Sequence, residues 1–199
     1  QNARFSEDLD FNALNVSPSE VTEELKTILE NKEINGIEFS SLEREKTSAG
    51  LKLSLKFMGL LKHPQRIRFD FNFRENLVLL SVEKPVFDDY ALSAITVNVM
   101  QLEEIFAEKI HALFTRAAAR DLYDAWFLFN NGVSLRQDLV GKKFSYYGEK
   151  YLLKNLSDRL YLFQPTWQQD LSQFIHGVPD FDSTSKKVVE KLEAGFKIN

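Results

Sequence analysis

The stretch Arg4-Phe5-Ser6-Glu7-Asp8-Leu9-Asp10-Phe11 is the most informative part of the sequence for the fold. Apolar and polar side chains alternate along it, and this period of two predicts a β-strand. Asp8 and Asp10, two residues apart, would then project from the same face of the strand. Two neighbouring carboxylates repel each other unless a cation lies between them, and Mg²⁺ prefers hard oxygen ligands. The pair is therefore a candidate metal site, and a solvated or oligomeric strand face is the alternative.

The composition narrows the choice of metal ligands and partners. The 199 residues suffice for one large domain or two small ones. No cysteine is present, so disulfides and cysteine-ligated metals are excluded, and with only three histidines oxygen ligands are favoured. A net charge of -4 argues against a protein held on nucleic acid by bulk positive charge. No apolar run is long enough for a membrane span and no signal peptide opens the chain, so we expect a cytoplasmic protein without a membrane partner.

The first half of the chain is rich in strand patterns. Strands are predicted over residues 37–48, 51–57, 66–73 and, more briefly, 95–99. The segment 37–48 starts with alternating residues and then loses its rhythm. One helix starts after Ser17-Pro18 and is expected to end near Asn35-Gly36.

The second half has the period of helices. Helices are predicted over residues 101–115 and 119–130, with weaker patterns over 134–144, 149–163, 166–175 and 184–196. The fold class is therefore α+β, a sheet with helices followed by an all-helical C-terminal region. We expect two domains, residues 1–100 and 101–199.

A third carboxylate, Asp70, stands on the polar side of the strand predicted over 66–73. If that strand lies beside the first, Asp70 would join Asp8 and Asp10 as a metal ligand. The alternative is an ion pair with Arg66 or Arg68.

Lys109 falls at helical spacing from the apolar residues Leu102, Phe106 and Leu113, so it lies on or beside the buried stripe of its helix. A lysine in such a place must extend outward or find an anion. It either binds phosphate or pairs with a nearby acid. His111 is expected to be an ordinary helix residue.

Asp121 and Asp124 are three residues apart and adjacent on one helix face. As acids in a first turn they would stabilise the helix N-terminus, which is a sufficient structural role. They are equally suited to orient Lys109 or an attacking hydroxyl.

Two segments of the sequence resemble signatures of one protein family. The segment Arg4–Phe11 resembles the Arg-x-Ser-x-Asp-Leu-Asp-Phe segment of the AbiEii/AbiGii nucleotidyltransferase toxins. The run Glu108-Lys109-Ile110-His111-Ala112-Leu113, followed by Arg116 and by Arg120-Asp121-Leu122-Tyr123-Asp124, resembles the second signature of that family, in the same order and at similar separation. The resemblance covers essentially the whole chain.

The resemblance implies a nucleotidyltransferase-like mixed sheet with a helical C-terminal region. It implies an Mg²⁺-dependent enzyme that transfers a nucleotide from an NTP to an acceptor, with tRNA or another RNA favoured. It further implies a toxin of a toxin–antitoxin or abortive-infection system, with an antitoxin as partner. By the same resemblance, Asp8, Asp10 and Asp70 are expected to bind metal, and Ser6 and Lys109 to bind the nucleotide. The residues expected to act in catalysis are Asp8, Asp10, Lys109, Asp121 and Asp124.

One feature of the family is expected to be missing. The family has a Gly-Gly-Thr-Ala-like stretch at a helix N-terminus before the acidic strand, where backbone amides hold the triphosphate. The chain begins after that position, so the stretch was removed, is disordered or was never part of the protein. Two further hypotheses stand beside the toxin enzyme. One is a non-catalytic relative that binds nucleic acid or a partner, and the other is an enzyme that modifies a small molecule such as an aminoglycoside.

Overall fold

The computed structural model describes residues 8–45, 47, 50–59, 62–74, 77–86, 95–116, 118–150 and 156–196. These residues form two compact units that divide between residues 75 and 76. We call the first the sheet unit and the second the helical unit. Strands give way to helices at Leu102, whereas the compact units divide earlier. The assignment of two domains, 1–100 and 101–199, stays a prediction.

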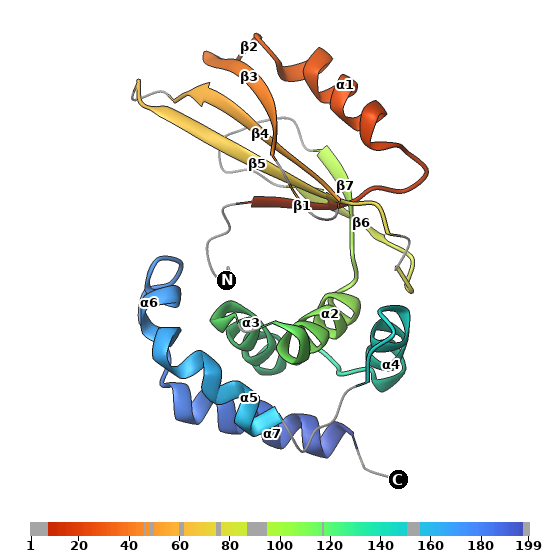
Figure 1. Ribbon diagram of the computed structural model, residues 1–199, viewed down its shortest axis with the longest axis vertical. Coiled ribbons are helices and arrows are strands. Elements are labelled where there is room, and N and C mark those ends of the chain that lie inside the picture. Colours follow the sequence, from red (N-terminus) through yellow and green to blue (C-terminus); the bar gives the residue numbers. More distant parts are fainter. Residues whose placement is uncertain are drawn as a thin grey trace. The chain divides into compact units, whose positions relative to one another are not determined.

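The sheet unit is built on a five-stranded mixed sheet with the order β1-β5-β4-β3-β2 (Figure 1). The strands are β1 (Asp8–Asn12), β2 (Glu33–Ile34), β3 (Ile37–Glu45), β4 (Leu51–Met58) and β5 (Pro64–Asn72). The edge strand β1 pairs parallel with β5, and every other pair is antiparallel. The predicted strands agree with these elements over the described residues.

Helix α1 (Pro18–Leu29) starts as the sequence indicates and ends earlier than predicted. Ser17 caps it in a capping box with Glu20, and Pro18 occupies the first turn. The expected end near Asn35-Gly36 is wrong. Both of these residues have positive φ, 52° and 77°, and they form the tight turn between β2 and β3. An Asn-Gly pair is a strong hairpin signal because both residues tolerate this backbone conformation.

The alternation of β4 and β5 builds the core of the sheet unit. Leu51, Leu53 and Leu55 are almost completely buried, and Phe69 and Phe71 lie beside them. Val21 of α1 packs on the same face, so the helix covers the apolar side of the sheet. Burial of one such leucine contributes about 1.5–3 kcal/mol. The opposite side carries the polar residues of the alternation, and these include the predicted metal ligands.

Two backbone irregularities explain departures from simple alternation. The pairing of β3 with β4 shifts register between Phe39 and Leu42, so an extra residue interrupts the period that the sequence loses after Phe39. Gly50 precedes β4 with φ of 75°, and a Cβ atom there would lie 2.5 Å from the carbonyl oxygen of Phe71. Only glycine fits this turn without displacing the backbone.

The helical unit starts with a two-stranded antiparallel sheet of β6 (Val82–Val86) and β7 (Ile95–Val99). Its helices are α2 (Leu102–Thr115), α3 (Ala119–Asn130), α4 (Gln137–Tyr146), α5 (Leu156–Leu160), the 3₁₀ helix η2 (Tyr161–Thr166), α6 (Trp167–Ser172) and α7 (Phe181–Gly195). All predicted helices are present, and β6 was not predicted.

One apolar core joins the helices of this unit. Its buried members include Phe106, Ile110 and Leu113 of α2, Leu122 of α3, Phe144 of α4, Trp167 of α6 and Val188 of α7. Leu102 was expected in this stripe but is 55% exposed, because it is the first residue of its helix. In the described part of the chain, no helix is long and apolar enough to cross a membrane.

Candidate active site

The predicted metal ligands lie together on one face of the sheet unit, which we call the acidic face. Because β1 and β5 pair in parallel, Asp10 lies directly opposite Asp70 in the register, and Asp8 lies opposite Arg68. Asp8 and Asp10 project to the same side because residues two apart on a strand share a face. Asp70 projects to that side as well because it pairs with Asp10 in the register. The condition under which Asp70 would join the pair is therefore met. Ser6 lies outside the described residues.

Lys52 is the principal cation on the acidic face. It lies opposite Asp70 on β4, and its Nζ is 2.6 Å from Asp70 Oδ2. The hydrogen bond to Asp70 raises the pKa of Lys52 and outweighs the opposing effect of partial burial; the charges of Asp70, Asp8 and Asp10 add to the rise. The alternative prediction, an ion pair of Asp70 with Arg66 or Arg68, is wrong. The register places Lys52 opposite Asp70, and Lys52 is its partner. The three carboxylates thus create a negative potential that holds a cation.

Arg68 of β5 also lies on the acidic face, opposite Asp8 of β1. Its Nη1 is 3.9 Å from Asp8 Oδ1 and its Nε is 3.6 Å from Glu45 Oε1. These are long, half-exposed contacts, and pairs of this kind contribute little to stability. They leave the arginine able to turn toward another anion.

The residues of the acidic face fit a divalent cation by chemistry and placement. Asp8, Asp10 and Asp70 offer hard oxygen ligands from two adjacent strands. Among the described residues, no three His, Asp or Glu side chains are already gathered around one point. Asp70 is instead turned to Lys52, and Asp8 lies near Arg68. Binding of a metal would require these side chains to turn from their cationic neighbours.

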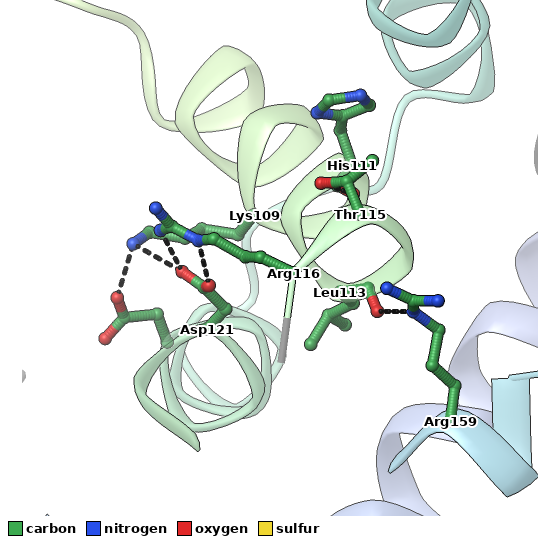
Figure 2. Close-up of polar contacts among 8 residues, drawn as sticks. Lys109, His111, Leu113, Thr115, Arg116, Asp121 and Arg159 are labelled. Atoms are coloured by element: carbon green, nitrogen blue, oxygen red, sulfur yellow. Dashed lines mark hydrogen bonds and ion pairs between the residues drawn. The ribbon is translucent and has the colours of Figure 1, made fainter. Parts of the chain in front are cut away.

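The second signature forms a compact group in the helical unit, which we call the Lys109 cluster: Lys109, Arg116, Asp121 and Asp124. Lys109 Nζ lies 3.2 Å from Asp121 Oδ1 and 2.7 Å from Asp124 Oδ2 (Figure 2). Arg116 holds Asp121 through two hydrogen bonds, of 2.6 Å from Nε and 2.8 Å from Nη2. The two acids lie on one face of α3, as their spacing predicts, and that face is turned to α2.

Asp121 is the buried centre of the Lys109 cluster. Its side chain is 1% exposed, whereas that of Arg116 is 64% exposed. Burial is the largest influence and would raise the pKa of Asp121, but the hydrogen bond from Arg116 and the charges of Lys109 and Arg116 outweigh it, so the pKa lies below its usual range. Asp121 is therefore a fixed anion that orients both cations. Asp121 does lie in the first turn of α3, where an acid stabilises the helix N-terminus. Its ion pairs with Lys109 and Arg116 give it a second role.

Lys109 remains partly accessible, with 23% of its side chain exposed. It forms ion pairs with Asp121 and Asp124, as expected from the prediction that Lys109 pairs with a nearby acid. A partly exposed ammonium group has three donors, so Lys109 can hold an additional anion such as a phosphate oxygen. Asp124, 11% exposed, borders the same ammonium group. The cluster can thus present one oriented positive charge.

A second buried ion pair in the helical unit was not predicted. Lys143 of α4 is completely buried, and its Nζ lies 2.6 Å from Glu104 and 2.9 Å from Glu108 of α2. Glu104 also accepts the backbone amides of Val78 and Leu79, at 2.7 and 2.8 Å. Burial opposes ionisation of Glu104, yet Lys143 and the two amides lower its pKa. The only sequence signal was that Glu104 and Glu108 are four residues apart on α2.

Two neighbouring contacts define the surroundings of the cluster. His111 points away from Lys109 (Figure 2). It stacks on Tyr147 at 4.4 Å between ring centroids, and its Nε2 lies 2.9 Å from Glu149. Arg159 donates to the carbonyl oxygen of Leu113 at 3.0 Å, near the end of α2. Lysine and arginine often satisfy the free carbonyls of a helix end. These residues therefore serve packing and capping.

Comparison with known proteins identifies a family and a similar fold. The profile of the family described as "Nucleotidyl transferase AbiEii toxin, Type IV TA system" matches residues 1–194. No curated protein matches the sequence significantly. Among solved structures, the fold is similar to that of MenT4, a nucleotidyltransferase toxin from Mycobacterium tuberculosis H37Rv, with a TM-score of 0.67 and 18% identity. That match covers 98% of this chain and 70% of MenT4.

Proposed function

Because the chain belongs to the AbiEii family of toxin nucleotidyltransferases and is an enzyme of this type, we propose that it transfers a nucleotide from an NTP to an RNA acceptor with the help of Mg²⁺. The observation that supports the metal most directly is the register of β1 and β5, which sets Asp10 against Asp70 with Asp8 on the same face. Paired carboxylates on adjacent strands are suited to hold Mg²⁺ together with substrate phosphates.

Asp8, Asp10 and Asp70 would hold the metal. A bound divalent cation would neutralise phosphate charge and favour attack on the α-phosphorus of the nucleotide. A nucleotide is transferred when an acceptor hydroxyl attacks that phosphorus and gives its proton to solvent, while pyrophosphate leaves with the electrons of the broken P–O bond. The sheet unit supplies the acidic face for this reaction, and Ser6 is proposed as an additional nucleotide contact.

The Lys109 cluster would supply a fixed positive charge. Lys109 is oriented by two acids and remains 23% exposed, so it can contact a phosphate without a large loss of side-chain freedom. Asp121 is held by Arg116 and is buried, which favours an orienting role for it. Asp124 is the better placed of the two acids to position the acceptor hydroxyl, since more of its side chain is exposed.

A transferase assay tests the reaction. The intact protein is incubated with each labelled NTP, Mg²⁺ and total RNA, and label in RNA is measured. We expect transfer by the wild type, loss of at least about a hundredfold in Asp8→Asn/Asp10→Asn, as for removal of groups that stabilise transition-state charge, and no loss in Asp138→Asn. Asp138 is a matched control because it pairs only locally with Arg136 in the contacts described. Equal transfer by the double variant, or none by the wild type, would sink the proposal.

The RNA acceptor is tested separately from the reaction. Purified tRNA, rRNA and an aminoglycoside are offered with the nucleotide that is used best, and tRNA is expected to take the label. Label on the small molecule alone would replace the RNA acceptor with the aminoglycoside. Label on neither, with transfer to total RNA present, would point to another RNA.

The biological role proposed is that of a cytoplasmic toxin neutralised by an antitoxin and active in abortive infection. Induced expression of the wild type is expected to arrest growth, and Asp8→Asn/Asp10→Asn is expected to leave growth normal at equal protein level. Co-expression of the neighbouring gene should relieve the arrest. Equal growth arrest by wild type and double variant would separate toxicity from nucleotide transfer.

A further inference from the structure

Lys52 lies next to Asp70 on the acidic face, where a divalent cation is proposed to bind. Its Nζ is 2.6 Å from Asp70, and the charges of Asp8 and Asp10 also act on it. Among the residues that the structure describes, Lys52 is the lysine that forms an ion pair with Asp70. Lys52 is therefore a built-in counter-ion of the acidic face.

The ammonium group and a metal would compete for Asp70. A Mg²⁺ or Mn²⁺ ion bonds a carboxylate oxygen at about 2.0–2.2 Å, which is closer than the 2.6 Å contact with Lys52. A dication on the same carboxylate would repel the ammonium group at short range. Lys52 is 43% exposed and has a long flexible side chain, so it can move into solvent at small cost.

We propose that Lys52 is a positioning residue that divalent metal must displace from Asp70, and that it thereby sets the metal affinity of the acidic face. The inference rests on the proposed function, because it assumes that the three acids bind metal. With Lys52 in place the acids are held without metal. Once Lys52 is displaced, its ammonium group lies at the edge of the site and can meet an incoming phosphate.

Lys56 provides a matched control on the same strand and face. It lies four residues from Lys52 on β4, is 44% exposed, and pairs with Glu43 at 2.5 Å. Replacing either lysine removes one charge from the same sheet face. Of the two lysines, Lys52 contacts a proposed metal ligand and Lys56 contacts Glu43, so loss of Lys52 should change metal binding and loss of Lys56 should not.

The experiment is a titration of the whole protein with Mn²⁺, followed by electron paramagnetic resonance of the free ion, without nucleotide. The variants are Lys52→Met, Lys52→Gln, Lys52→Arg, Lys56→Met and Asp8→Asn/Asp10→Asn, each checked for a native circular dichroism spectrum. Two neutral replacements of Lys52 are included in case one of them folds poorly.

We expect Lys52→Met and Lys52→Gln to bind Mn²⁺ about tenfold more tightly than the wild type. Lys52→Arg and Lys56→Met should stay within about twofold of the wild type, and the aspartate double variant should lose binding. If the neutral Lys52 variants bind as Lys56→Met does, or more weakly, while binding still depends on Asp8 and Asp10, the inference is overturned and the proposed function stands. If no protein binds Mn²⁺ at these acids, the proposed metal site fails as well.

Discussion

The acidic face and the buried charges of the helical unit show two ways in which a protein can hold ion pairs. On the acidic face, Lys52 and Asp70 are 43% and 33% exposed, so water competes with their contact. In the helical unit, Lys143 and Glu104 are both 0% exposed, and Asp121 is 1% exposed. A buried charge that loses its partner has no water to replace it. Exposed pairs can therefore exchange for a substrate or metal, whereas buried pairs serve as fixed structure.

The largest effect on stability is expected from Lys143→Met. It removes the cation shared by Glu104, which is completely buried, and Glu108, which is 27% exposed. We expect a loss of about 3–5 kcal/mol in the free energy of unfolding, measured by urea denaturation. The control is Lys142→Met, an exposed neighbour on the same helix. Similar losses in the two variants would mean that the buried pair does not determine stability.

The next effect is expected from Asp121→Asn. Arg116 and Lys109 lose their common anion, and the amide cannot accept two hydrogen bonds from Arg116 as the carboxylate does. We expect a loss of about 2–3 kcal/mol, the cost of a disrupted buried charged contact, by the same denaturation assay. Asp138→Asn, at an exposed pair, serves as the control. A wild-type unfolding midpoint for Asp121→Asn would show that the Lys109 cluster is not a stabilising element.

A smaller effect follows from pH. The pKa values of Asp121 and Glu104 are lowered in the folded protein, from ordinary values of 3.8 and 4.5. Their contribution to stability is thus complete above those values and is lost as pH falls through the lowered folded-state pKa. We expect the stability difference between wild type and Asp121→Asn to be constant from pH 7 to about pH 5 and to shrink below about pH 3.8. A difference that grows on acidification would contradict the direction of the Asp121 shift.

The smallest effect is expected from Lys52→Met without metal. The pair with Asp70 is half exposed, so its removal should change the free energy of unfolding by less than about 1 kcal/mol. Thermal unfolding at low and high salt measures this, since salt screens exposed charges. A loss comparable with that of Lys143→Met would show that Lys52 is structural and would weaken the contrast between the two regions.

Prediction from sequence succeeded for elements that a local pattern of apolar and polar residues specifies. The clean alternation of residues 51–57 and 66–73 gave correct strands, and the helices at 101–115 and 119–130 agree closely with α2 and α3. Prediction failed where pairing between two strands determines the local structure. The sequence predicts a helix end at Asn35-Gly36, but pairing of β2 with β3 makes it a hairpin turn. No local period reveals such a pairing when the strand has only two residues.

The candidate site was predicted in its residue types more than in its contacts. Spacing alone put Asp8 with Asp10 and Asp121 with Asp124. The contact of Lys109 with both later acids was one of two alternatives. Lys52 and the pair of Lys143 with Glu104 were not predicted, because their partners are 18 and 39 residues away in the sequence.

Local sequence is enough to predict each family signature, the strand and helix periods, and the carboxylates that share a face, since each of these depends on residues close together in the chain. Which cation meets each carboxylate depends on the tertiary structure. Lys52 reaches Asp70 only because β4 pairs antiparallel with β5, and Lys109 reaches Asp121 only because α2 packs on α3. Charge acts over distance in space and not along the chain, so the partners of Asp70 and Asp121 follow from the register of the strands and the packing of the helices.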